Sequence, residues 1–138
     1  MEFVALDVET ANANMASICQ IGIAHFSNGQ LINEWKSYVN PEDYFDGINV
    51  SIHGIDESTV ADAPTFEMLA STIASALDGR IVVTHSAFDK ISIYRAGTKC
   101  QAPAPCCTWL DSAYRAPRLE TVFEKRLRVG ECLQLHWI

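Results

Sequence analysis

The sequence predicts a single α/β domain built around a mixed sheet. Three strand-like segments come first, and segments with helical and strand patterns alternate after them, which is the order expected of such a sheet. No repeat or low-complexity linker divides the chain, and 138 residues suffice for one sizeable core but not for two. We therefore expect one domain.

The first half of the expected sheet lies in residues 2–39. Residues 2–8, 16–26 and 30–39 are rich in apolar and β-branched side chains and each predict a strand. Asn28-Gly29 separates the last two and favours a tight hairpin turn. The polar residues 40–49 predict a loop that leaves the sheet.

Residues 62–79 contain the clearest helical pattern. Pro64 suits the first turn of a helix, and Gly79 suits its end. Four apolar residues recur at helical spacing and predict a buried stripe: Phe66, Leu69, Ile73 and Leu77.

Strand and helix then alternate to residue 111. Residues 80–85 predict a fourth strand, residues 86–97 a helix ended by Gly97, and residues 104–111 a fifth strand. The remaining tail has a weak helical pattern that Pro117 interrupts.

Composition indicates a compact soluble protein of the cytoplasm. Hydrophobic residues make up 49% of the chain, the mean hydropathy is +0.06, and no apolar run approaches the length of a membrane span. Glu2 follows Met1 directly, so the basic and then apolar pattern of a secretory signal is missing. The five cysteines lack CxxC or zinc-finger spacing, and we interpret them as reduced, small apolar residues.

The charge is unevenly spread along the chain. The net charge is −7, but residues 1–79 hold twelve acids and one base, whereas residues 80–138 hold nine bases and five acids. An acidic protein of this kind is not a coating protein for DNA, because that work relies on many phosphate contacts. A protein that grips only the end of a strand through metal ions does not need a basic surface.

Asp7 and Glu9 stand two residues apart at the end of the first predicted strand. Side chains at this spacing share one face, so each carboxylate raises the cost of ionising the other. A divalent cation between them would remove that cost. The alternative is a strand that ends at the surface with two solvated acids.

Five segments resemble one enzyme superfamily in order and spacing. Residues 3–12, 16–22, 52–56, 62–66 and 82–90 are similar to those of the DEDD 3′→5′ exonucleases of the DEDDh type. This superfamily includes the proofreading (epsilon) subunit of the bacterial replicative polymerase, ribonuclease T and oligoribonuclease. The resemblance spans about residues 2–112 and implies a ribonuclease H-like fold with a five-stranded sheet flanked by helices.

The resemblance also implies a site. Asp7, Glu9 and Asp89 match carboxylates that hold two Mg²⁺ or Mn²⁺ ions, with Asp7 bridging both. Thr10 and Phe88 match positions that contact the terminal nucleotide. Two such ions clamp the attacking and leaving oxygens of a phosphodiester.

Other polar residues in these segments have structural interpretations. Ser86 stands where the family usually has Asn, and the pair Ser86 and Asp89 also suits the start of a helix, a role that is compatible with metal binding. We expect His53, His85 and Asp111 to be structural. His85 matches a family position beside the second motif that is not the general base, His53 lies in the packing segment 52–56, and Asp111 matches a family position that is usually structural.

The third family motif, His-x-x-x-x-Asp on a final helix, is missing. No aspartate follows Ala113, and the only late histidine is His136. Residues 126–130 can be encoded so that a frame shifted by one nucleotide gives Gly-Tyr-Gly-Leu, which relatives carry before that helix. We therefore divide the chain into an exonuclease domain, residues 1–112, and an atypical tail, residues 113–138, that a frameshift could have produced.

Three interpretations remain open from the sequence, and the third is a purely structural remnant in which Asp7 and Glu9 are surface acids. The first is a 3′→5′ exonuclease that releases nucleoside 5′-monophosphates from single-stranded 3′ ends of DNA or RNA, impaired by the missing motif. The second is an inactive metal- or nucleotide-binding module that dimerises. A polymerase partner and a homodimer are both compatible with these functions, and a membrane is not expected. The homodimer is expected because a lost final helix would expose apolar surface, which the apolar residues 132–138 could partly cover.

Overall fold

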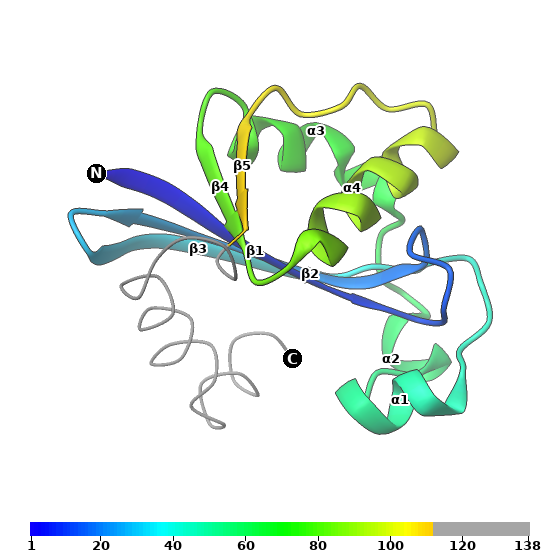
Figure 1. Ribbon diagram of the computed structural model, residues 1–138. Coiled ribbons are helices and arrows are strands. Elements are labelled where there is room, and N and C mark those ends of the chain that lie inside the picture. The colour runs from blue at the N-terminus through cyan, green and yellow to red at the C-terminus, as the bar shows by residue number, and fades with distance from the viewer. Residues whose placement is uncertain (112–138) are drawn as a thin grey trace.

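A five-stranded mixed sheet forms the centre of the computed structural model, which describes residues 1–111 (Figure 1). Its strands run in the order β3-β2-β1-β4-β5. They are β1 (Glu2–Thr10), β2 (Ile18–Ser27), β3 (Gln30–Tyr38), β4 (Ile81–Thr84) and β5 (Thr108–Asp111). The first three strands pair antiparallel, and β4 and β5 extend the sheet in parallel with β1. The expected mixed sheet is confirmed.

Four helices accompany the sheet in the described part of the chain: α1 (Gly47–His53), α2 (Glu57–Val60), α3 (Phe66–Leu77) and α4 (Ala87–Lys99). Figure 1 shows α3 and α4 together over one face, whereas α1 and α2 lie past the other face, near the end of β1. None of these helices is long and apolar enough to cross a membrane.

The alternating side chains of β1 divide the core between the two faces of the sheet. Val4, Leu6 and Val8 join the apolar cluster that α3 and α4 cover. Phe3 and Ala5 point the other way, and the ring of Phe3 stacks on Phe26 with 5.1 Å between ring centroids. Asp7 and Glu9 continue this second series, so they lie on the face opposite to α3 and α4.

Several local predictions are confirmed. Asn28 and Gly29 adopt φ values of 50° and 79° in the turn between β2 and β3, as a tight hairpin of the predicted kind requires. All four stripe residues of α3 pack into the main apolar cluster: Phe66, Leu69, Ile73 and Leu77.

Two helix boundaries differ from the prediction. Pro64 precedes α3 instead of lying in its first turn, because the Thr65 side chain caps the helix by accepting a hydrogen bond from Met68 N. Gly97 lies inside α4, which continues to Lys99. The left-handed conformation that follows the helix is adopted by Gln101, with φ 59°.

The prediction of a loop over residues 40–49 is wrong for its last three residues, because α1 begins at Gly47. Asp46 caps this helix by accepting a hydrogen bond from Ile48 N, and Gly54 ends it with φ 74°. Both are ordinary capping signals, but only seven residues separate them, and three of those are Ile or Val, which favour strands. The predictions for the tail, including those on Pro117, His136 and the frameshift, lie outside the described residues.

Candidate active site

The end of β1 extends past its parallel neighbour. β1 pairs with β4 only at Val4 and Ala5, and the chain then leaves β4 to enter α4. The amide of Val8 therefore has no strand partner on this side and donates instead to Oδ1 of Asp89, at 3.0 Å. This bond ties the start of α4 to the strand that carries Asp7 and Glu9.

Asp89 lies in the first turn of α4 and is only 4% exposed. Ser86 is the N-cap residue, as predicted, and its Oγ accepts a hydrogen bond from Phe88 N at 3.3 Å. Burial raises the pKa of Asp89 to about 6, although the hydrogen bond from the Val8 amide and the electrostatic interaction with His85 act in the opposite direction. The carboxyl is therefore held in an environment that disfavours its charge.

Asp7 and Glu9 share this effect. The pKa of Asp7 is raised well above its ordinary value, first by burial and then by the charges of Asp89 and Glu9. A side-chain hydrogen bond between Asp7 and Asp89 raises it further. Burial also raises the pKa of Glu9. Three carboxyl groups that act on one another and whose pKa values are all raised make the end of β1 the candidate functional site of the described residues.

The donor set suits a hard divalent cation, because it consists of carboxylate oxygens. Asp7 and Asp89 are in direct contact, and Glu9 acts on both through its charge. Among residues 1–111, however, no three Asp, Glu, His or Cys side chains form a group that could hold a metal ion as they stand. The metal role of Asp7, Glu9 and Asp89 therefore stays a prediction.

Thr10 lies at the base of this site and is 5% exposed. Its carbonyl oxygen accepts hydrogen bonds from Asn49 Nδ2 at 3.0 Å and His53 Nε2 at 2.9 Å. Nδ1 of His53 accepts a bond from Ile55 N, so the ring is neutral with its proton on Nε2. The structural interpretation of His53 is confirmed, and the nucleotide contact of Thr10 stays a prediction.

Phe88 lies on the opposite side of the sheet from Asp7 and Glu9. It is partly buried against the apolar cluster that α3 and α4 cover. Its proposed contact with substrate also stays a prediction.

The sequence patterns missed two residues on the face of the site. The β-sheet register places Gly22 opposite Asp7 and Gln20 opposite Glu9. Gln20 is 3% exposed, and within the described part of the chain its Oε1 has no hydrogen-bond partner. A glutamine and a glycine inside an otherwise apolar strand were the available signal, because a buried polar side chain needs a reason.

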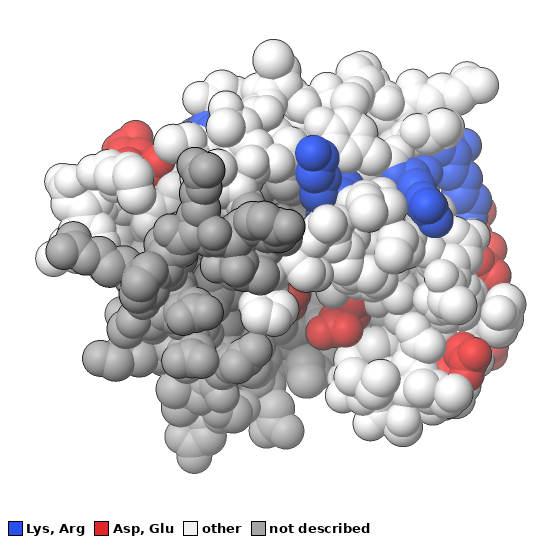
Figure 2. Space-filling view, in the orientation of Figure 1, with Lys and Arg blue, Asp and Glu red and all other residues white. Residues whose placement is uncertain are grey.

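Apolar and basic surfaces flank the carboxyl groups. On and beside α1, Tyr44, Ile48 and Ile52 are 63%, 70% and 76% exposed. In Figure 2, Lys and Arg side chains lie over α4, and Asp and Glu side chains lie below them towards α1. The exposed basic residues of α4 are Lys90, Arg95 and Lys99.

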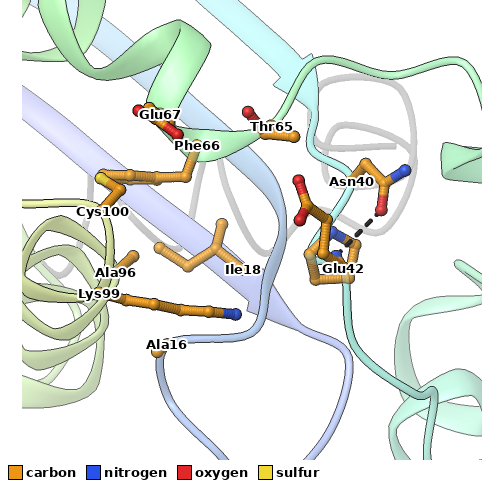
Figure 3. Close-up of a pocket in the computed structure, with 11 residues that line it drawn as sticks. Ala16, Ile18, Asn40, Glu42, Thr65, Phe66, Glu67, Ala96, Lys99 and Cys100 are labelled. Atoms are coloured by element: carbon orange, nitrogen blue, oxygen red, sulfur yellow. Dashed lines mark hydrogen bonds between the residues drawn. The ribbon is translucent and has the colours of Figure 1, made fainter.

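A separate pocket of about 180 Å³ lies between the start of α3 and the end of α4 (Figure 3). Phe66, Lys99 and Glu42 are among its lining residues, and none of the predicted site residues lines it. This pocket is therefore distinct from the carboxyl cluster.

Comparison with known proteins gives a consistent result. The family of RNase T exonucleases matches residues 4–113. A PolC-type DNA polymerase III of Caldanaerobacter subterraneus is 29% identical over 71% of the chain, and the 3′-5′ exonuclease DinG of Bacillus subtilis is 29% identical over 96% of it. The chain spans only 7% and 15% of the lengths of these relatives.

Solved structures resemble the whole fold. Exonuclease X in complex with 5′ overhanging duplex DNA aligns with a TM-score of 0.66 and 21% identity, covering 90% of this chain and 72% of that one. A full-length 3′-exonuclease aligns with a TM-score of 0.68 and 16% identity, covering 94% and 52%. The predicted ribonuclease H-like fold, with its five-stranded mixed sheet and flanking helices, is confirmed.

Proposed function

Because the chain belongs to the RNase T exonuclease family of the DEDD superfamily, we propose that it hydrolyses nucleic acid from the 3′ end in a reaction that depends on Mg²⁺ or Mn²⁺. The observation that carries this proposal is the acidic cluster at the end of β1, where Asp7 contacts Asp89 and Glu9 adds a third charge. Where burial and mutual repulsion destabilise charged carboxylates, a bound cation stabilises them most.

Asp7, Glu9 and Asp89 would hold the ions. Once bound, two divalent ions supply an activated water and neutralise the charge of the phosphodiester. The protein holds the acceptor oxygens in place, because β1 fixes Asp7 and Glu9 on one face and the Val8 amide fixes Asp89. The contact of Asp89 with the Val8 amide also orients its carboxyl group relative to β1.

Hydrolysis at this site would cleave the bond between phosphorus and the O3′ of the penultimate nucleotide. Water adds its oxygen to phosphorus, and a proton passes to the leaving oxygen. The products are a nucleoside 5′-monophosphate and a strand shortened by one nucleotide with a new 3′-hydroxyl.

The surface around the site supports a single-stranded substrate. Thr10 lies next to the carboxyl groups, and the exposed Ile48 and Ile52 on the adjacent helix α1 offer apolar surface to unstacked bases. The similarity to part of a PolC-type DNA polymerase III supports association with a polymerase as part of the same proposal.

We also propose that this 138-residue chain works slowly. It contains no His-x-x-x-x-Asp motif after Ala113, so the general base and fourth carboxylate of the family have no sequence counterpart there. General-base catalysis alone typically contributes about 10²–10⁴-fold to a rate.

Hydrolysis of a 5′-labelled single-stranded oligonucleotide in Mn²⁺ tests the function. We expect products that shorten one nucleotide at a time from the 3′ end, and no reaction in excess EDTA. Asp7→Ala should abolish the reaction, whereas Asp62→Ala, which changes an exposed acid near α2, should not alter it. Equal rates for wild type and Asp7→Ala would contradict the proposal.

A further inference from the structure

The end of β1 is held from outside the sheet by side chains of α1. Nδ2 of Asn49 lies 3.0 Å from the carbonyl oxygen of Thr10 and 3.4 Å from its hydroxyl oxygen. Nε2 of His53, one helical turn further on, donates to the same carbonyl at 2.9 Å. Two side chains from one short helix therefore occupy the acceptor positions of a single backbone carbonyl.

Neighbouring residues strengthen this attachment. The amide of Asp46, the N-cap residue of α1, donates to the carbonyl of Ala11 at 2.9 Å. Nδ2 of Asn12 donates in the other direction, to the carbonyl of Tyr44 at 2.8 Å. Three consecutive residues after Glu9 are thus bonded to the segment that contains α1.

The attachment coincides with an irregularity in the sheet. The pairing of β1 with β2 shifts register between Glu9 and Thr10, so Glu9 is the last residue of β1 in regular register, opposite Gln20, and Thr10 pairs with Ile18 after the shift. Regular pairing with β2 therefore holds Glu9 from its N-terminal side only. Asn49 and His53 supply bonds on the far side of this irregularity.

We propose that Asn49 is a positioning residue, which holds Thr10 and thereby fixes the orientation of Glu9 in the active site. The proposal deepens the exonuclease function and rests on it. The side-chain hydrogen bonds of Asn49 go to Thr10 and not to the carboxyl groups. It acts through the backbone of Thr10, and because it donates to the Thr10 hydroxyl oxygen, that hydroxyl keeps its proton to donate to a terminal nucleotide.

Three variants of the full chain separate this role from simple packing. Asn49→Ala removes both bonds to Thr10, and Asn49→Asp preserves the size of the side chain but replaces its N–H donors with an acceptor. Ser51→Ala is the matched control, since its hydroxyl lies on the same helix and donates only within it, to the carbonyl of Ile48. All three are compared below their melting temperatures, so that folded protein is measured.

In hydrolysis assays with Mn²⁺, we expect both Asn49 variants to lose about tenfold in kcat, the lower end of the range for residues that orient a metal ligand. KM should change by less than about threefold, and Ser51→Ala should match wild type. A normal kcat in Asn49→Asp would overturn the proposal, because it would show that side-chain volume suffices.

Backbone amide order parameters from NMR provide a readout that needs no activity. In wild type and Ser51→Ala, the amides of Glu9 and Thr10 should have values near 0.85, as in rigid backbone. Both Asn49 variants should lower them, while leaving Val4 in the middle of the sheet unchanged. If wild type proves inactive, the exonuclease proposal fails, and unchanged order parameters at Glu9 and Thr10 would separately overturn the positioning role.

Discussion

Replacing Asp89 with asparagine should make the protein more stable while removing its activity. The Asp89 side chain is 4% exposed, and its Oδ1 accepts the Val8 amide at 3.0 Å. Asparagine has nearly the same shape and keeps an oxygen for that bond. Its amide group can also donate a hydrogen bond to Asp7. The substitution removes the charge of Asp89, which is one of the charges that raise the Asp7 pKa.

The magnitude follows from the pKa of Asp89, which burial raises from 3.8 to about 6. A shift of this size corresponds to about 3 kcal/mol of unfolding free energy. Because the folded-state pKa is raised, Asp89 does not lower the free energy of unfolding of the wild type below about pH 4. As the pH rises from about 4 to about 6, ionisation of Asp89 lowers that free energy progressively. Asp89→Asn lacks this loss, so its advantage should be small at pH 4 and about 3 kcal/mol above pH 7.

Thermal unfolding of the metal-free protein between pH 4 and pH 8 measures this difference. An advantage of about 3 kcal/mol corresponds to a rise in Tm of about 10 °C for a chain of this size. Asp78→Asn is the control, because Asp78 also accepts one backbone N–H, from Cys106 at 2.8 Å, but is exposed. A stability difference between Asp89→Asn and wild type that does not vary with pH would refute the reasoning.

Two further predictions concern the surroundings of the site. Ser86→Ala removes the N-cap of α4 and should lower the free energy of unfolding by about 1 kcal/mol in denaturant titrations; no change would mean that the Oγ bond to Phe88 N contributes nothing. Ile52→Glu should leave stability within about 0.5 kcal/mol but weaken binding of a fluorescent single-stranded oligonucleotide, because it places a charge on an exposed apolar position of α1. Ile32→Glu, at an exposed position on β3, is the control, and equal losses in both variants would exclude a specific role for α1.

The sequence predicted the elements whose signals are local. Alternating apolar residues in β1 placed Asp7 and Glu9 on one face, and the hairpin turn at Asn28-Gly29 followed from residues that tolerate positive φ. Ser86 was recognisable as a helix cap for the same reason. Asp89 could be connected to Asp7 only through the family resemblance, because 81 residues separate it from Val8, its hydrogen-bond partner.

The contacts that depend on tertiary packing could not be predicted. Nothing in the local pattern indicates that Asn49 and His53 bind the Thr10 carbonyl, since the sequence predicts a loop at Asn49 and no helix between Asn49 and His53. Gly97 was expected to end α4, yet the helix continues and Gln101 takes the left-handed conformation. A glycine permits such an end without requiring it.

Calorimetric titration with Mn²⁺ at pH 6, in two buffers with different enthalpies of ionisation, tests most directly whether the acidic cluster binds a cation. The pKa of Asp89 is raised to about 6 and that of Asp7 is raised as well, so protons compete with a metal ion, which binds only the deprotonated groups. We predict that Mn²⁺ binding releases more protons at pH 6 than at pH 8, and that Asp7→Asn abolishes both the binding and the release. Absence of binding in the wild type, or binding that Asp7→Asn leaves unchanged, would contradict a metal site at the end of β1.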